Sequence, residues 1–224
     1  MKFMVPFVAA AAIAATASAG FEGFSTENID IGGGKTVSKV YACFNGASDT
    51  LLNVFDISYA GGVDTSGFGS GNFYHSDFSN FSPYSSTTGT WNPGFTPAVP
   101  FPPLSAYDSF LTIGGGGGPS NTWTTADPDF GDAGLGQAGL VEGAGWYNGN
   151  PSNLKGLNDG GKVFIGQFVI DTGKGWFVNA QVGFNQGLGT STVFGAGMFT
   201  IGVPAPGAVA LLGLAGLAGR RRRA

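Results

Sequence analysis

Cysteine and histidine are nearly missing from this chain of 224 residues, which holds one of each. A disulfide framework, a Cys/His zinc site and a four-cysteine iron–sulfur site are therefore excluded within one chain. Charge is also scarce, because Asp, Glu, Lys and Arg make up 11% of the residues, against about 25% in ordinary soluble domains. At 42% hydrophobic residues, however, the chain has enough apolar material to form a core.

Arginine does not occur in residues 20–202, where five lysines stand against all 14 acidic residues and give a formal charge of −9. Binding to nucleic acid needs several Lys or Arg side chains that neutralise phosphates. The charge balance therefore predicts that nucleic acid is not a partner of this protein.

The first 19 residues have the three parts of a secretory signal peptide. Lys2 supplies a short positive region, residues 3–15 are mostly apolar, and Ala17 and Ala19 form the small-x-small pattern at which signal peptidase cleaves. We therefore expect a signal helix in residues 1–19, cleavage after Ala19, and export of the rest of the chain.

The last 22 residues combine a proline-containing breaker, a short apolar helix and a cationic end. A helix over residues 203–219 would be about 25 Å long, close to the ~30 Å of a bilayer core, so a short transmembrane helix is expected. Its terminal arginines would stay cytoplasmic and leave the body outside. The pattern is carried by Val203, Pro204, Pro206, Gly207, Arg220, Arg221, Arg222 and Arg223.

This order of features resembles the PEP-CTERM sorting signal of exported bacterial proteins, although Ala205 stands where that family has a glutamate. The resemblance implies that residues 203–224 are a sorting and anchor segment, recognised by an exosortase-type processing peptidase in the membrane. It also implies release into an exopolysaccharide-rich layer at the cell surface. A permanent C-terminal membrane anchor is the alternative. Two body segments, residues 41–54 and 107–114, also look like parts of other secreted proteins with this tail.

The body, residues 20–202, has the pattern of an all-β domain. In residues 176–184 apolar side chains recur at a period of two, which is typical of a strand with one buried face. Residues 162–171 are apolar on both faces, and a short glycine-containing connection follows, so these two strands are expected to pair as a hairpin. Short strands along one chain predict a β-sandwich of jelly-roll-like form with long Gly/Pro-rich loops. Further strands are expected at residues 36–44, 51–60, 107–113 and 192–201.

Two segments of the body do not fit the strand pattern. Residues 76–104 contain six prolines and predict a long loop over the sheet. Residues 114–118 are five glycines, but no Gly-Lys-Ser/Thr follows them, so they indicate a turn rather than a phosphate-binding loop.

Cys43 and His75 are the two rare side chains with reactive chemistry. Cys43 lies in an apolar run, which predicts a free thiol buried in a strand, because a free cysteine packs as a small hydrophobe. His75 would be the base for any Ser or Cys nucleophile, yet no serine lies in a Gly-x-Ser-x-Gly sequence.

Three aspartates close together form a candidate calcium site. Asp127, Asp129 and Asp132 offer the carboxylate oxygens that calcium prefers, with Gly131 to let the chain curl. Their spacing lacks the EF-hand series, so a solvated acidic turn without any metal or other cofactor is the alternative that we favour.

Three tryptophans are candidates for sugar binding. Trp91, Trp123 and Trp146 lie in turn-rich segments, where an exposed ring could stack on a sugar, although core packing is the commoner use of tryptophan.

The sequence thus predicts an exported, non-enzymatic protein of the cell surface or extracellular matrix, held at least transiently in the membrane by its C-terminal helix. A carbohydrate-binding module for exopolysaccharide is the alternative. A secreted glycoside-active enzyme is a weaker one, because nothing selects a catalytic pair among 14 carboxylates.

Overall fold

The computed structural model describes residues 20–62, 73–77, 82–85, 91, 108–114, 124–127, 139–187 and 189–202. In this part of the chain the regular structure consists of antiparallel strands and one short 3-10 turn, η6 (Pro151–Asn153). None of the helical structure in these residues is long and apolar enough to cross a bilayer. The expected helices at residues 1–19 and 203–219 lie outside the described residues.

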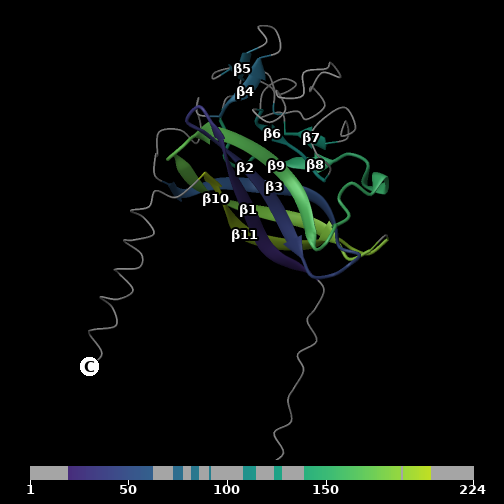
Figure 1. Ribbon diagram of the computed structural model, residues 1–224. Coiled ribbons are helices and arrows are strands. Elements are labelled where there is room, and N and C mark those ends of the chain that lie inside the picture. The colour runs from purple at the N-terminus through teal and green to yellow at the C-terminus, as the bar shows by residue number, and fades with distance from the viewer. Residues whose placement is uncertain are drawn as a thin grey trace, which may run out of the picture.

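Most strands belong to two antiparallel sheets that pack face to face, as expected for a β-sandwich (Figure 1). A small sheet of β4 (His75–Asp77) and β5 (Ser82–Ser85) lies at one end. Sheet A has the order β1 (Phe21–Gly32), β2 (Lys35–Phe44), β9 (Lys162–Asp171), β6 (Phe110–Leu111). Sheet B has the order β11 (Val193–Gly202), β10 (Gly175–Asn185), β3 (Thr50–Gly62), β8 (Trp146–Asn148), β7 (Thr124–Ala126).

The core lies between the two sheets and follows the alternation seen in the sequence. The predicted apolar face of β10 is confirmed, since its five side chains are at most 2% exposed. Full burial of a valine or phenylalanine side chain, such as Val178, Val182 or Phe184, contributes about 1.5–3 kcal/mol. Residues on β2 and β9 meet this face from sheet A. The contributing side chains are Trp176, Val178, Ala180, Val182 and Phe184 from β10, and Val40, Ala42, Phe44, Val163, Ile165, Phe168 and Ile170 from sheet A.

The expected hairpin between residues 162–171 and 176–184 is wrong. β9 pairs with β2 and β6, whereas β10 pairs with β3 and β11, so the turn at residues 172–174 crosses from sheet A to sheet B. Gly173 has a φ of 91° there, a left-handed conformation that favours glycine. A short glycine turn between two apolar strands suits either arrangement, which is why the sequence did not distinguish them.

β1 is a strand that the sequence analysis did not predict. Its residues are largely polar and half-exposed, but it pairs along its length with β2 and packs beside β11. The hydroxyl of Thr26 donates a hydrogen bond of 2.8 Å to the main-chain oxygen of Thr200 across this contact. A Cβ on Gly195 of β11 would lie 2.5 Å from Cδ1 of Phe21, so glycine leaves room for that ring.

Two other expectations needed revision. The strand expected at residues 107–113 is shorter, because only Phe110–Leu111 pairs, as β6. The long loop expected at residues 76–104 contains the β4–β5 pair in part. Phe73, just before this segment, and Trp91, within it, are fully buried in the core.

Candidate binding site on the outer face of sheet A

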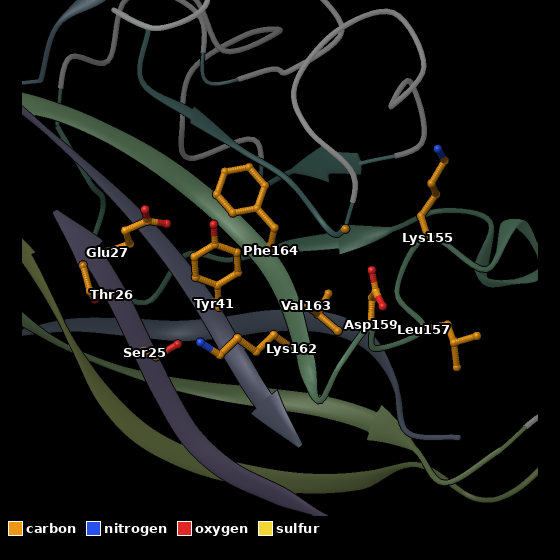
Figure 2. Close-up of a pocket in the computed structure, with 11 residues that line it drawn as sticks. Ser25, Thr26, Glu27, Tyr41, Lys155, Leu157, Asp159, Lys162, Val163 and Phe164 are labelled. Atoms are coloured by element: carbon orange, nitrogen blue, oxygen red, sulfur yellow. The ribbon is translucent and has the colours of Figure 1, made fainter. Parts of the chain in front are cut away.

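A depression of about 570 Å³ lies on the face of sheet A that points away from the core (Figure 2). Strands β1, β2 and β9 form its floor, and the loop that carries Lys155, Leu157 and Asp159 borders one side. The floor strands contribute Ser25, Thr26, Glu27, Tyr41, Lys162, Val163 and Phe164, and Gly114 completes the lining.

Two aromatic rings, those of Tyr41 and Phe164, lie next to each other in this depression. They are Cα partners on β2 and β9, and they point outward because the residues on either side of each are buried in the core. Their ring centroids are 5.3 Å apart with an interplanar angle of 43°. The edge of Phe110 supports Phe164 from β6, at 6.0 Å and 84°. Both rings are half-buried, so part of each remains open to the depression.

Charged groups of both signs surround the two rings. Burial raises the pKa of the Tyr41 hydroxyl, and the nearby Glu27 carboxylate, which accepts its hydrogen bond, raises it further. The ammonium Nζ of Lys162 lies 5.7 Å from the centre of the Tyr41 ring, within reach of a cation–π interaction. Lys155 and Asp159 lie on the bordering loop (Figure 2). The site therefore offers ring surfaces, hydrogen-bond acceptors and hydrogen-bond donors to one ligand.

No protein-family model, curated protein or solved structure matches this chain. The assignment of this site therefore depends on its own geometry.

The tryptophans predicted as exposed sugar platforms are not exposed. Trp91 is 0% and Trp146 is 1% exposed, and both belong to the core. The Trp146 indole Nε1 donates a hydrogen bond of 3.0 Å to the main-chain oxygen of Thr112. The turn-rich segments fold back into the sandwich at these points, which composition alone does not reveal. Trp123 lies outside the described residues.

Asp127 is the one member of the candidate calcium cluster that the structure describes. It is half-buried, and its main-chain N–H donates to the oxygen of Gly145 at 2.8 Å. Asp129 and Asp132 lie outside the described residues. In the described part of the chain, no group of three or more His, Cys, Asp or Glu residues could hold a metal ion.

His75 is fully buried beside Asp108 and Ser109, a proximity that the sequence did not predict. Its Nδ1 lies 2.9 Å from the main-chain oxygen of Ser109 and 3.8 Å from Oδ1 of Asp108. The Ser109 hydroxyl accepts a hydrogen bond from the main-chain N–H of Val169. The polar groups thus tie residues 73–77 and 108–114 to β9, and the Ser109 hydroxyl is engaged by β9.

The expectation that Cys43 is a buried thiol is wrong, because the residue is only half-buried. It lies on the outward side of β2, two residues beyond Tyr41, and its Sγ donates to the hydroxyl of Ser25 at 3.3 Å. Because the core takes Ala42 and Phe44, strand alternation turns Cys43 outward, and the period of two was the available signal.

The main functional candidates, Tyr41 and Phe164, were missed because the sequence shows each strand but not which strands pair. The predicted processing residues, Ala17 and Ala19, lie outside the described residues. So do all the tail residues, Val203, Pro204, Pro206, Gly207 and Arg220 to Arg223.

Proposed function

We propose that this protein is an exported, non-enzymatic protein of the cell surface or extracellular matrix that binds polysaccharide in the depression on sheet A. The observation that carries this proposal is the outward-facing pair of Tyr41 and Phe164 between carboxylate and ammonium groups. Aromatic rings contact the apolar C–H faces of sugars, and the polar groups around them can bind sugar hydroxyls.

The dimensions and charge of the site favour a polysaccharide over other ligands. Its volume of about 570 Å³ suits a few sugar rings, and small-ligand sites span roughly 300–1,000 Å³. Two acidic side chains, Glu27 and Asp159, offset two lysines, Lys155 and Lys162, so the site has no strong preference for a highly charged ligand. The charge of −9 in residues 20–202 opposes binding to nucleic acid.

The ends of the chain supply the cellular setting of this proposal. Cleavage after Ala19 exports the body, and the segment 203–224 brings it to an exosortase-type peptidase and then to the exopolysaccharide layer. The signal helix, the short C-terminal transmembrane helix and the jelly-roll-like form of the sandwich belong to this proposal. No catalytic residue and no metal are part of it.

The binding proposal is tested by native electrophoresis of the purified chain in gels that contain exopolysaccharide from the producing cells. We expect the polymer to retard the wild-type protein. Tyr41→Ala should weaken binding about tenfold, which corresponds to about 1.4 kcal/mol. Tyr41→Phe keeps the ring and should bind nearly as well, and Val193→Ala, an exposed apolar position away from the site, should bind as wild type. Equal retardation of wild type and Tyr41→Ala would refute this site.

The sorting proposal is tested on the chain in its own cells. Mass spectrometry of the secreted wild-type protein should give a C-terminus near residues 203–207, without the apolar helix. Each arginine costs about 2.5–3.5 kcal/mol to place in the bilayer, so four should hold the tail at the cytoplasmic side. Deleting Arg220 to Arg223 should release chains with an intact apolar tail. Wild-type protein recovered only as full-length membrane material would instead show a permanent anchor.

A further inference from the structure

Sheet B carries two exposed aromatic side chains in one row of residues on its own outer face, on the opposite side of the core from the depression. The row crosses four strands, because Tyr147 pairs with Asn53, Asn53 with Gly183, and Gly183 with Phe194. These residues point outward, since the neighbours Trp146, Val54 and Val182 point into the core. Phe194 is 66% and Tyr147 is 49% exposed. Both rings therefore lie on one face of the sheet, where a single extended ligand can contact them.

Gly183 leaves room for the Asn53 amide and lies beneath the Phe194 ring. A Cβ at this glycine would meet the amide oxygen of Asn53 and would lie 3.5 Å from Cε1 of Phe194, so the ring and the amide both lie over the bare backbone. The edge of Phe55 contacts Phe194 from β3, with centroids 6.0 Å apart at 82°. The ring is therefore held on its inner side by the sheet, and its remaining surface is open to a ligand.

The rest of this face has little charge and is rich in amides. β10 and β11 contain no charged residue, and β3 contains only Asp56, which accepts a 2.6 Å hydrogen bond from the Gln181 amide. Asn53, Asn179 and Gln181 are the outward amides of β3 and β10. Without lysine or arginine, these strands do not complement an anionic membrane or an acidic polymer.

A second copy of the chain fits this face less well than a polymer does. A stable dimer buries about 800 Å² on each partner around a well-packed apolar centre. Here Tyr147 is separated from the exposed apolar side chains of β11, Phe194 and Met198, by Asn53 and Gly183. Three strand spacings, about 14 Å, separate Tyr147 from Phe194, which is the layout for an extended polymer that contacts both rings across the half-buried Asn53.

We infer that the row Tyr147–Asn53–Gly183–Phe194 is a second polysaccharide-binding site, specific for an uncharged polymer. One protein molecule then bridges two polysaccharide molecules. The inference rests on the proposed function, because the depression on sheet A is the other binding site. Two sites on opposite faces cannot bind the same short stretch of polymer. Occupation of both sites therefore cross-links polysaccharide molecules, and the protein gains avidity for them.

A two-polymer capture assay tests the bridge. Exopolysaccharide from the producing cells is immobilised, the purified full chain is added, and soluble fluorescent hydroxyethylcellulose, a neutral glucan, is applied last. Wild type should retain the fluorescent polymer. Phe194→Ala should be captured in equal amount but retain at least tenfold less fluorescence, whereas Phe194→Tyr, which keeps a ring, should behave as wild type. Val193→Ala is the matched control, because it removes an exposed apolar side chain from the other side of the same strand.

The outcomes separate this inference from the proposed function. If Tyr41→Ala is not captured but still binds hydroxyethylcellulose in solution, both sites exist and are independent. If Tyr41→Ala is captured as wild type while Phe194→Ala loses hydroxyethylcellulose, the second site stands and the first fails. Equal fluorescence with wild type and Phe194→Ala overturns the second site. Self-association in sedimentation, or binding to phosphatidylcholine vesicles, also overturns it if Phe194→Ala abolishes that interaction.

Discussion

The two outer faces of this sandwich differ in charge and in shape. The three long strands of sheet A, β1, β2 and β9, carry seven charged residues, whereas β3, β10 and β11 of sheet B carry one. Sheet A has a depression bordered by the loop of residues 155–159, and its aromatic rings are half-buried. Sheet B presents its most exposed ring, that of Phe194, over a glycine.

This difference shows how a chain with few charges can build two distinct surfaces on one core. The charges gather on one sheet, where they surround the rings of Tyr41 and Phe164. The other sheet relies on amides and glycine, which cost little to expose and leave rings accessible. Both faces depend on the same core, so substitutions in the core should affect both, and substitutions on one face should leave the other intact.

The largest effect is expected from Trp146→Ala, because Trp146 is part of the core that the two faces share. Replacing a buried tryptophan with alanine costs about 3–5 kcal/mol of unfolding free energy. Trp146→Phe keeps most of the volume but loses the hydrogen bond to Thr112, so it should cost less. Urea denaturation followed by circular dichroism measures both. A small stability loss together with loss of polysaccharide binding would mean that Trp146 is an exposed platform after all.

The buried position of Trp146 shows where prediction from the sequence stops. The periodic strands β2, β3, β9, β10 and β11 were predicted within one or two residues of their observed bounds, because alternation and β-branched residues report directly on local structure. The core face of β10 was predicted for the same reason. Which segments fold back over the core depends on contacts far apart in the sequence, and those leave no local pattern.

The candidate site required the same non-local information. Tyr41 and Phe164 are recognisable as outward residues of two strands, but their contact depends on the register of β2 against β9, which includes a bulge between Val40 and Tyr41. β1, which brings Glu27, was missed because its polar residues lack a regular alternation. The crossing between β9 and β10 shows the same limit, since a glycine turn is compatible with a hairpin or with a change of sheet.

A second, smaller effect on stability should distinguish Gly195, on the inner face of β11, from Gly183, on the outer face of β10. Gly195→Ala places a methyl carbon 2.5 Å from the Phe21 ring, which packs against Phe24 and Phe44, so β1 must move away from β11. Overpacking of this kind costs about 1–3 kcal/mol. Gly183→Ala meets only the end of the Asn53 side chain, which can rotate, so stability should change by about 0.5 kcal/mol or less.

Binding should follow the opposite order in these two variants. Gly183→Ala displaces the Asn53 amide beside the Phe194 ring and should weaken hydroxyethylcellulose binding, whereas folded Gly195→Ala should retain it. Thermal unfolding and the capture assay provide the two measurements. Equal stability losses, or binding lost only in Gly195→Ala, would contradict the assignment of inner and outer faces.

Acid should act on sheet A through an ion pair at the end of β2 and β9. Burial alone would raise the pKa of Asp171, but hydrogen bonds from Lys35 at 2.7 Å and from Tyr74 at 2.9 Å, with the charge of Lys174, hold it below its ordinary range. A depressed carboxyl pKa stabilises the fold above the unfolded value of about 3.9, and this stability is lost as the pH falls through the folded value.

The matching variant for this acid effect is Asp171→Asn, which keeps the size of the side chain. Between about pH 5 and pH 2 the wild type should lose more stability than Asp171→Asn. The difference should be about 1 kcal/mol or less, because the carboxylate is 37% exposed and screened by solvent. Thermal melts across that range measure it, and salt should reduce it. Burial lowers the pKa of Lys35, yet Asp171 and Tyr74 raise it overall, so the lysine's contribution is lost only above about pH 10.5. Parallel pH curves for the two proteins would show that the pair contributes nothing.

The smallest effect uses the single thiol to report which face is occupied. Cys43 is half-buried on the outward side of β2 and donates a hydrogen bond to the hydroxyl of Ser25, which lines the depression. A thiol reagent should therefore modify the native protein without denaturant, but more slowly than the unfolded chain. Exopolysaccharide bound on sheet A should slow the reaction a further few-fold in both wild type and Phe194→Ala. Hydroxyethylcellulose should leave the rate unchanged, because its site lies beyond the core on sheet B. If both polymers protect Cys43 to the same extent, the two ligands share one face and the distinction between the sheets is lost.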